Sequence, residues 1–320
     1  MKLIVQPDAG VAPVVSAIKR AKKSIDVLIF RLDRREVIQA LEAAAARGIT
    51  VRALIAHTNR GGEKTLRKLE MGLLASGLTV TRTSDDLVRY HGKMLIVDGK
   101  ILHVYGFNLT ALDIGKSRSF GITTRNLHLV QEAIKLFEAD CARQPYTAGY
   151  NRFVVSPENA RECLSVFIKS ARKQLLIYDP KVADPAILRL LNDRQKAGVE
   201  IKIIGRMGNT KSEVTAERYP GRRLHIRAII RDGRRAFLGS QSLRRLELDK
   251  RREIGVIIHD DGVVRLMQTV FEQDWALTDR GKKEAKKAVK AVKAEKAEKK
   301  EEKAEKKAEK AEIASQTAAG

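Results

Sequence analysis

Short apolar runs alternate along the chain with segments in which apolar residues recur every three or four positions. The runs predict buried β-strands, and the recurring positions predict amphipathic helices. The opening run, MKLIV, is broken by Gln6, Pro7 and Asp8. We interpret it as a first strand and a turn rather than as a secretion signal. No run approaches the ~18 apolar residues that would span a bilayer.

The second half of the chain repeats the first. Three pairs of segments correspond, namely 19–30 with 169–178, 41–56 with 191–205, and 133–141 with 266–275. In the second pair, Gly48 and Gly198 are the expected caps between a helix and a buried strand. Strands that alternate with helices in both halves predict an α/β fold of two tandem domains, with mixed, mainly parallel sheets flanked by helices.

The repeat also locates an insertion. Gly48 and Gly198 lie 150 residues apart, whereas His91 and His225, which also correspond, lie 134 apart. The first half therefore holds extra residues between Gly48 and His91. The segment 63–77 has helical apolar spacing, so we expect a helix there.

Turn-forming residues near 144–155 separate the two halves. We therefore expect one domain over residues 1–148 and a second over 149–280. From 281 to 320 the chain consists almost entirely of Lys, Ala and Glu, with too few apolar residues to bury a face. This composition predicts a solvated, basic and part-helical tail.

One short pattern occurs once in each half, as HGKMLIVD in the first and HIRAIIRD in the second. Each gives a histidine, a cation two residues later and an aspartate seven residues later: His91, Lys93 and Asp98, then His225, Arg227 and Asp232. The apolar run and the Asp-Gly pair predict a strand and a hairpin turn. On a strand, the histidine and the cation share one face, whereas the aspartate lies on the other face, where it can hold backbone amides. These six residues are the candidate catalytic set, with the aspartates in a supporting role.

A phosphodiester is the substrate group that suits such a set. Breaking it requires a nucleophile, a proton for the leaving oxygen and positive charge near the non-bridging oxygens. A neutral imidazole can attack phosphorus and form a phosphohistidine, and a second, protonated imidazole can act as the acid. Lys93 and Arg227 would hold the phosphoryl oxygens. The six His and two Cys show no metal-ligand spacing, so we expect no cofactor.

The repeated pattern resembles the His-x-Lys-x4-Asp signature of the phospholipase D superfamily, and the resemblance extends over residues 1–280. It implies two α/β domains related by pseudo-twofold symmetry, with one active site between them. One motif histidine would be the nucleophile and the other the acid and base. The superfamily includes phospholipases D, cardiolipin synthase-like transferases, nucleases and some phosphohydrolases.

The chain departs from the Gly-Ser-x-Asn pattern that usually follows each motif. The second half keeps Ser240 but has Ser242 where Asn is usual, and the first half keeps Asn108 but has Gly106 where Ser is usual. The resemblance implies that Asn108, Ser240 and Glu253 support the site or bind the substrate phosphate.

The usual carboxylate about 28 residues beyond the histidine is present in only one half. Glu253 follows His225 at this distance, whereas Ser119 stands at the matching position after His91. We expect Glu253 to accept a hydrogen bond from His225, raise its pKa and make it the general acid. His91, without such a partner, would remain neutral and act as the nucleophile.

The charge balance favours an anionic partner. The chain carries 62 Lys and Arg against 39 Asp and Glu, a net charge of +23, of which the 13 Lys and 8 Glu of the tail supply only +5. A basic body is typical of proteins that bind a polyanion or an anionic surface, although a generally basic proteome would also explain it. Cys141 and Cys163 form no disulfide framework, which fits a reducing cytoplasm.

Three classes of function follow. The first is a phospholipase D-type enzyme that cleaves or transfers a phosphatidyl group, with a phospholipid substrate and an anionic membrane surface as partner. The second is a metal-independent nuclease, which the basic body favours, although an aromatic content of 5% offers few rings for stacking nucleic-acid bases. The third is a decayed anion-binding protein, in which Arg227, Ser119 and Ser242 mark the loss. We expect a cytoplasmic monomer, peripheral at the membrane in the first case.

Overall fold

The computed structural model describes residues 1–59, 61–208 and 213–317, and the side chains at 293, 297, 302 and from 304 onward lie outside this description. Met1–Phe271 form one compact unit and Glu272–Gly320 form another. We describe each unit by itself.

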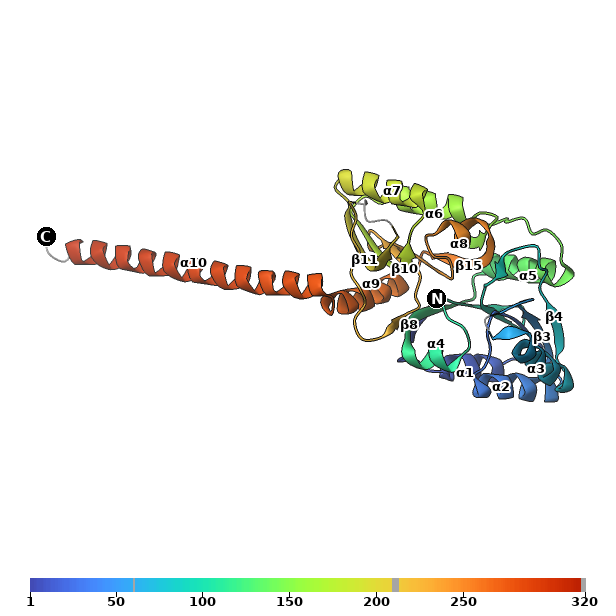
Figure 1. Cartoon of the computed structure of the whole chain (residues 1–320). Coiled ribbons are helices and arrows are strands. Elements are labelled where there is room, and N and C mark those ends of the chain that lie inside the picture. The colour runs from blue at the N-terminus through green and yellow to red at the C-terminus, as the bar shows by residue number, and fades with distance from the viewer. Residues whose placement is uncertain (60, 209–212, 318–320) are drawn as a thin grey trace. The chain divides into compact units, whose positions relative to one another are not determined.

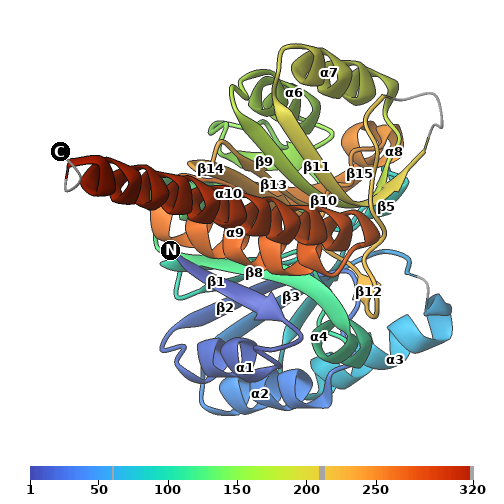
Figure 2. The ribbon, with the colours of Figure 1, turned by 90° about the vertical axis from the view of Figure 1, so that its left-hand side faces the viewer.

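The first unit contains two mixed sheets, each covered by helices, which confirms the expected α/β class (Figures 1 and 2). The first sheet has the order β1 (Lys2–Gln6), β8 (Ser117–Thr124), β7 (Ile101–Tyr105), β6 (Met94–Val97), β2 (Ser24–Ile29), β3 (Thr50–Ile55) and β4 (Thr79–Arg82). Parallel pairing joins β2, β3 and β4, and antiparallel pairing joins the strands from β2 to β1. The hairpin between β6 and β7 turns at Asp98 and Gly99, both with positive φ, as the Asp-Gly pair predicted.

The second sheet repeats this plan. Its order is β11 (Glu200–Met207), β10 (Gln174–Val182), β13 (Ala228–Arg231), β14 (Arg235–Gly239), β15 (Arg251–Ile258) and β5 (Arg89–Tyr90), with β9 (Phe153–Ser156) also paired to β15. Here β10 and β11 are parallel, and β13 and β14 form the hairpin that turns at Asp232 and Gly233.

Helices cover both sheets. They are α1 (Ala12–Lys19), α2 (Arg35–Ala46), α3 (Gly62–Ala75), α4 (Ala111–Lys116), α5 (Leu127–Ala142), α6 (Ala160–Lys169), α7 (Pro185–Lys196), α8 (Arg245–Asp249) and α9 (Asp261–Ala276). Helices α1 and α2 bury their apolar stripes on the first sheet, and α6 and α7 do the same on the second. Helix α3 is the insertion expected at 63–77, and Gly48 and Gly198 end their helices with φ near +80°.

Each half also gives one short strand to the sheet of the other half. Strand β5, from the first half, pairs in parallel with β15, whereas β12 (Arg223–Leu224), from the second half, pairs in parallel with β8. Both short strands directly precede a motif histidine. The fold therefore carries each histidine to the edge of the opposite sheet.

The second unit consists of the end of α9 and the helix α10 (Asp279–Thr317). Within α10, Lys299 donates to Glu295 across one turn at 2.5 Å. Among the described residues, no helix has both the length and the apolar character needed to cross a bilayer.

Candidate active site

The two histidine motifs are the places where the chain passes from one sheet to the other. The amide of His91 donates to the carbonyl of Arg252 in the second sheet (2.7 Å), and two residues later the carbonyl of Lys93 accepts from Tyr105 in the first sheet (3.0 Å). Strand β6 accordingly starts at Met94, so the histidine and the cation lie in an extended connection before the strand, not within it.

The second motif crosses in the same way. The amide of His225 donates to the carbonyl of Arg118 in the first sheet (3.0 Å), and the carbonyl of Arg227 accepts from Gly239 in the second sheet (3.2 Å). Both histidines are buried, with 8% of His91 and 7% of His225 exposed. The two crossings run in opposite directions between the sheets, and Lys93 and His91 lie near enough to His225 to lower its pKa.

Glu253 pairs with His91, and the expectation that it pairs with His225 was wrong. Its Oε2 lies 2.8 Å from Nδ1 of His91, and its side chain is fully buried. The cause is the strand exchange, because β15 runs beside β5, in register through Arg252 and Tyr90, and so brings Glu253 next to the first histidine.

His225 has a different neighbour, which the sequence analysis missed. The Nδ1 atom of His225 lies 3.5 Å from Oδ2 of the buried Asp113 in α4, and it has no hydrogen-bond partner among the described residues. Ser119, at the position that matches Glu253, donates instead to the backbone carbonyl of His225 (2.9 Å). The sequence does contain a pattern that could have pointed to Asp113, because an acidic residue follows each motif histidine by 22 positions, Asp113 after His91 and Glu247 after His225.

The two motif cations hold the backbone of their own histidines. The Nζ of Lys93 donates to the carbonyl of His91, and Nη1 of Arg227 donates to the carbonyl of His225 at 3.4 Å. The Lys93 side chain is fully buried, and its Nζ lies 5.6 Å from the centre of the Phe30 ring. The ring of Phe30 also meets the imidazole of His91 edge-on. The ring thus forms an apolar wall against both groups.

Burial and nearby positive charge lower the pKa values of both histidines, and burial lowers that of Lys93. Burial, with the charges of Lys93 and Arg227, lowers the pKa of His91 well below its usual value. Burial, with the charges of Arg227 and Arg223, does the same to the pKa of His225. Burial lowers the pKa of Lys93 to about 7. Both imidazoles are therefore neutral at pH 7 before an anion arrives.

Glu253 receives opposing influences. Burial raises the pKa of its carboxyl above the usual value, and the positive charges of Lys93, Arg227 and Arg251 offset only part of this rise. The charges of Lys93 and Arg227 also act on both histidines, which shows how closely the two motifs approach. The backbones of the halves meet here as well, because a Cβ on Gly106 would lie 3.3 Å from the carbonyl of Gly239.

Asp98 and Asp232 hold backbone amides, which confirms the supporting role expected for them within the candidate set. Each sits at the far end of its motif strand and accepts hydrogen bonds of 2.7–3.2 Å from three consecutive backbone amides: Lys22, Lys23 and Ser24 for Asp98, and Arg172, Lys173 and Gln174 for Asp232. The two aspartates therefore anchor the hairpins to the starts of β2 and β10, in the supporting role expected from their face of the strand.

The remaining expected residues are at or next to the centre. Asn108 donates from Nδ2 to Asp113 (2.7 Å), and its buried Oδ1 has no partner among the described residues. Ser240 Oγ accepts from the amide of Ile254, the neighbour of Glu253 (3.1 Å). Ser242 Oγ lies 3.4 Å from Nε of Arg227, so this serine orients the guanidinium. The described residues contain no cluster of His, Cys, Asp and Glu that could hold a metal ion.

Solved structures of other proteins share this fold. Polyphosphate kinase from Porphyromonas gingivalis matches 85% of this chain and 49% of its own, at 21% identity and a TM-score of 0.70. Phosphatidylserine synthase from Haemophilus influenzae Rd KW20 matches 85% of this chain and 84% of its own, at 11% identity and a TM-score of 0.65. The chain spans about half the length of the kinase. At these identities the likeness shows the fold alone.

The family comparison covers most of the chain. The family model for "Cardiolipin synthase, PLD-like domain" matches residues 14–141 and, a second time, residues 164–275. A search among curated protein sequences gives no match. Each matched stretch contains one crossing motif, with His91 in the first and His225 in the second. The chain therefore belongs to the phospholipase D-like family, as a tandem of two such domains.

Proposed function

We propose that this chain cleaves or transfers a phosphodiester through a covalent phosphohistidine on His91, with His225 as the acid and then the base. The observation that carries the proposal is the hydrogen bond between Nδ1 of His91 and the buried Glu253 (2.8 Å). In this proposal Glu253 accepts the hydrogen bond, so Nδ1 carries the proton of the neutral ring. The lone pair of Nε2 is then available to attack phosphorus.

The first step forms the bond between Nε2 of His91 and phosphorus and breaks the bond between phosphorus and the leaving oxygen. That oxygen takes a proton from His225. The phosphodiester's negative charge raises the pKa of His225 when it binds, and Asp113 at 3.5 Å supports the imidazolium. Lys93 and Arg227 place positive charge beside the non-bridging oxygens.

The second step releases the covalent group. Neutral His225 takes a proton from water or an alcohol, the resulting oxygen attacks phosphorus, and the bond to His91 breaks. The ring of His91 returns to its starting tautomer, because the buried Glu253 still holds the proton on Nδ1. Hydrolysis and transfer thus differ only in the acceptor.

The first candidate substrate is a phospholipid, because the family model that matches this chain is described as a cardiolipin synthase, PLD-like domain. Nucleic acid is the second, and a specific observation favours it. A pocket lined by four arginines lies beside His225. A lipid with one phosphate would leave such a pocket without an anion.

Trapping of the covalent intermediate tests the reaction. Purified protein in EDTA is mixed with a phosphodiester of p-nitrophenol, quenched in alkali and digested, and phosphohistidine is located by mass spectrometry. We expect phosphate on residue 91, none in His91→Ala, and accumulation in His225→Ala, because p-nitrophenolate leaves without an acid but water still needs a base. Phosphate on residue 225 of the unaltered protein would contradict the assignment.

The substrate is tested in parallel reactions. Phosphatidylcholine and phosphatidylglycerol vesicles are offered in one series and single-stranded and plasmid DNA in the other, with His91→Ala as the control. Head-group release or strand cleavage that this variant abolishes would assign the substrate. Binding without any turnover would support the third class, a decayed anion-binding protein.

A further inference from the structure

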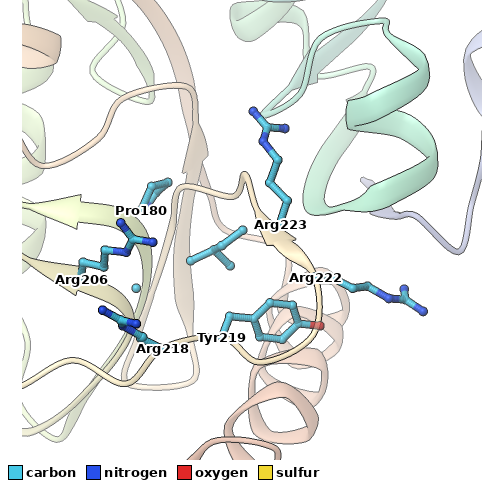
Figure 3. A pocket seen from close by; sticks show the side chains of 8 residues that line it. Pro180, Arg206, Arg218, Tyr219, Arg222 and Arg223 are labelled. Atoms are coloured by element: carbon cyan, nitrogen blue, oxygen red, sulfur yellow. The ribbon is translucent and has the colours of Figure 1, made fainter.

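A pocket of about 370 Å³ lies at one end of the second sheet. Four of the residues that line it are arginines, Arg206, Arg218, Arg222 and Arg223, and all four are exposed (Figure 3). No carboxylate is among the described residues of its lining. The pocket therefore presents concentrated positive charge to a ligand.

The backbone builds this pocket at the carboxyl ends of the parallel strands β10 and β11, where ligands of α/β folds commonly bind. Gly205 is packed against β10 so closely that a Cβ would lie 1.7 Å from the carbonyl of Asp179, so no other residue fits. The amide of Gly205 donates to the carbonyl of Glu217 (2.8 Å). This bond pins the loop to the strand end and sets Arg206 beside Arg218 (Figure 3).

The four guanidinium groups differ in how far they are neutralised. Arg223 is paired with Asp113, and Arg222 lies 3.7 Å from Asp8. Arg206 and Arg218 form no ion pair with any residue that the structure describes. These two guanidiniums can bind an anion without first breaking a pair, in the forked geometry that suits phosphate oxygens.

The pocket adjoins the catalytic centre on the side of His225. Leu224 lines the pocket and is the residue directly before His225. Arg223 bonds to one oxygen of Asp113, and the other oxygen lies 3.5 Å from Nδ1 of His225. The position that matches Arg206 in the first half is Ala56, which is buried, so the first half has no such arginine there.

We propose that this arginine pocket is a second phosphate subsite, which holds the phosphate next to the scissile one on the leaving-group side of a nucleic-acid strand. The inference rests on the proposed function, because His225 marks the leaving-group side only if it is the acid. Tyr219 adds an aromatic ring to the lining, fixed through a hydrogen bond from Arg118 to its hydroxyl (3.3 Å). Arginines beside an aromatic ring are typical of sites that take a single strand, with phosphate on the cations and a base on the ring.

Binding to single-stranded DNA tests the subsite without turnover. A fluorescent oligonucleotide is titrated in EDTA with the His91→Ala protein, with and without Arg206→Gln and Arg218→Gln together. We expect the affinity to fall about tenfold and the salt dependence of log K to lose about 0.7 of its slope, for the loss of one phosphate contact on a single strand. The matched control, Arg172→Gln with Arg189→Gln, removes the same charge from exposed arginines elsewhere in the second half. Equal losses in both pairs would overturn the proposal.

Cleavage of short substrates separates this proposal from the proposed function. The dinucleotide TpT has only the scissile phosphate, whereas pTpT and TpTp each add a phosphate on one side. We expect one of these additions to lower KM about tenfold, and the Arg206→Gln, Arg218→Gln protein to lose that gain while it cleaves TpT as before. Turnover of TpT without any gain would overturn the subsite alone.

Two other outcomes are equally decisive. In the first, no nucleotide is turned over, but head groups are released from phosphatidylglycerol equally with and without Arg206→Gln and Arg218→Gln. This result would overturn the subsite and leave the reaction chemistry intact. Absence of turnover with all substrates would reject the proposed function, and the titration would still decide whether the pocket binds a strand.

Discussion

Glu253 of the second half holds His91 of the first, through a hydrogen bond of 2.8 Å that joins residues 162 positions apart. Glu253 is fully buried and lies in β15, the third strand after His225. The carboxylate therefore orients the imidazole that we assign as nucleophile, instead of activating the acid. The backbone of each histidine bonds to a strand of the other half, so we expect that the two halves cannot act separately.

Glu253→Gln tests this pairing. The amide can still accept from Nδ1 but carries no charge to stabilise the phosphohistidine, so we expect kcat to fall about 10²-fold or more. Formation of the phosphoenzyme should slow more than its hydrolysis, which quenched-flow measurements with a p-nitrophenyl ester will show. Ser119→Ala is the matched control at the equivalent position of the first half, and a loss of similar size there would contradict the special role of Glu253.

Lys93→Met should give a more stable but inactive protein. Burial lowers the pKa of Lys93 to about 7, whereas an unfolded lysine titrates near about 10.4. The unfolded state therefore binds more protons between these values, and the unaltered protein loses stability as the pH falls from about 10 to about 7. We expect the variant to have the higher Tm, by a margin that is larger at pH 6 than at pH 9. An equal difference in Tm at both pH values would show that the protein does not bury the charged amine of Lys93.

The pH profile of kcat/KM should report three groups. His91 must be neutral, and its lowered pKa places the acid limb well below pH 6.5. His225 takes up its proton from solution as the substrate binds, and Lys93 must be protonated, so kcat/KM falls as the pH rises, first above the lowered pKa of His225 and then more steeply above about pH 7 with Lys93. In Lys93→Arg the guanidinium stays charged, so the steeper part should disappear. Its persistence would mean that another group titrates there.

Asp98→Asn and Asp232→Asn should affect folding and not chemistry. Burial raises the pKa of both carboxyls, but bonds from backbone amides outweigh it and hold each pKa below its usual range. The stabilisation is therefore complete above about pH 4 and is lost as the pH falls through the lower folded values. Asparagine tolerates the positive φ, so each change tests the charge.

Each of these two variants should lower the free energy of unfolding by about 1–3 kcal/mol, measured in urea at pH 7, with kcat retained. Asp85→Asn, at an exposed aspartate, is the control for loss of one negative charge. A large fall in kcat at unchanged stability would show that Asp98 or Asp232 takes part in the chemistry.

The elements of the fold could be predicted because they depend on neighbours in sequence. Apolar periodicity marked the helix at 63–77, and glycines at 48 and 198 marked helix ends, since only local backbone conformation decides them. The support that Asp98 gives to backbone amides also followed from a local rule, the alternation of faces along a strand.

The amino-acid sequence by itself determined the two histidines and their cations, because each motif is written within eight consecutive residues. It also determined the tandem repeat, because corresponding segments recur in the same order in both halves. Only the tertiary structure decided which carboxylate serves which histidine. That choice depends on β5 and β12 joining the sheets of the opposite halves. The tertiary structure also decided the arginine pocket, where the close approach of Gly205 to β10 sets Arg206 beside Arg218. Pairings between strands so far apart in the chain leave no local pattern of apolar and polar positions, since they depend on how two complete sheets meet.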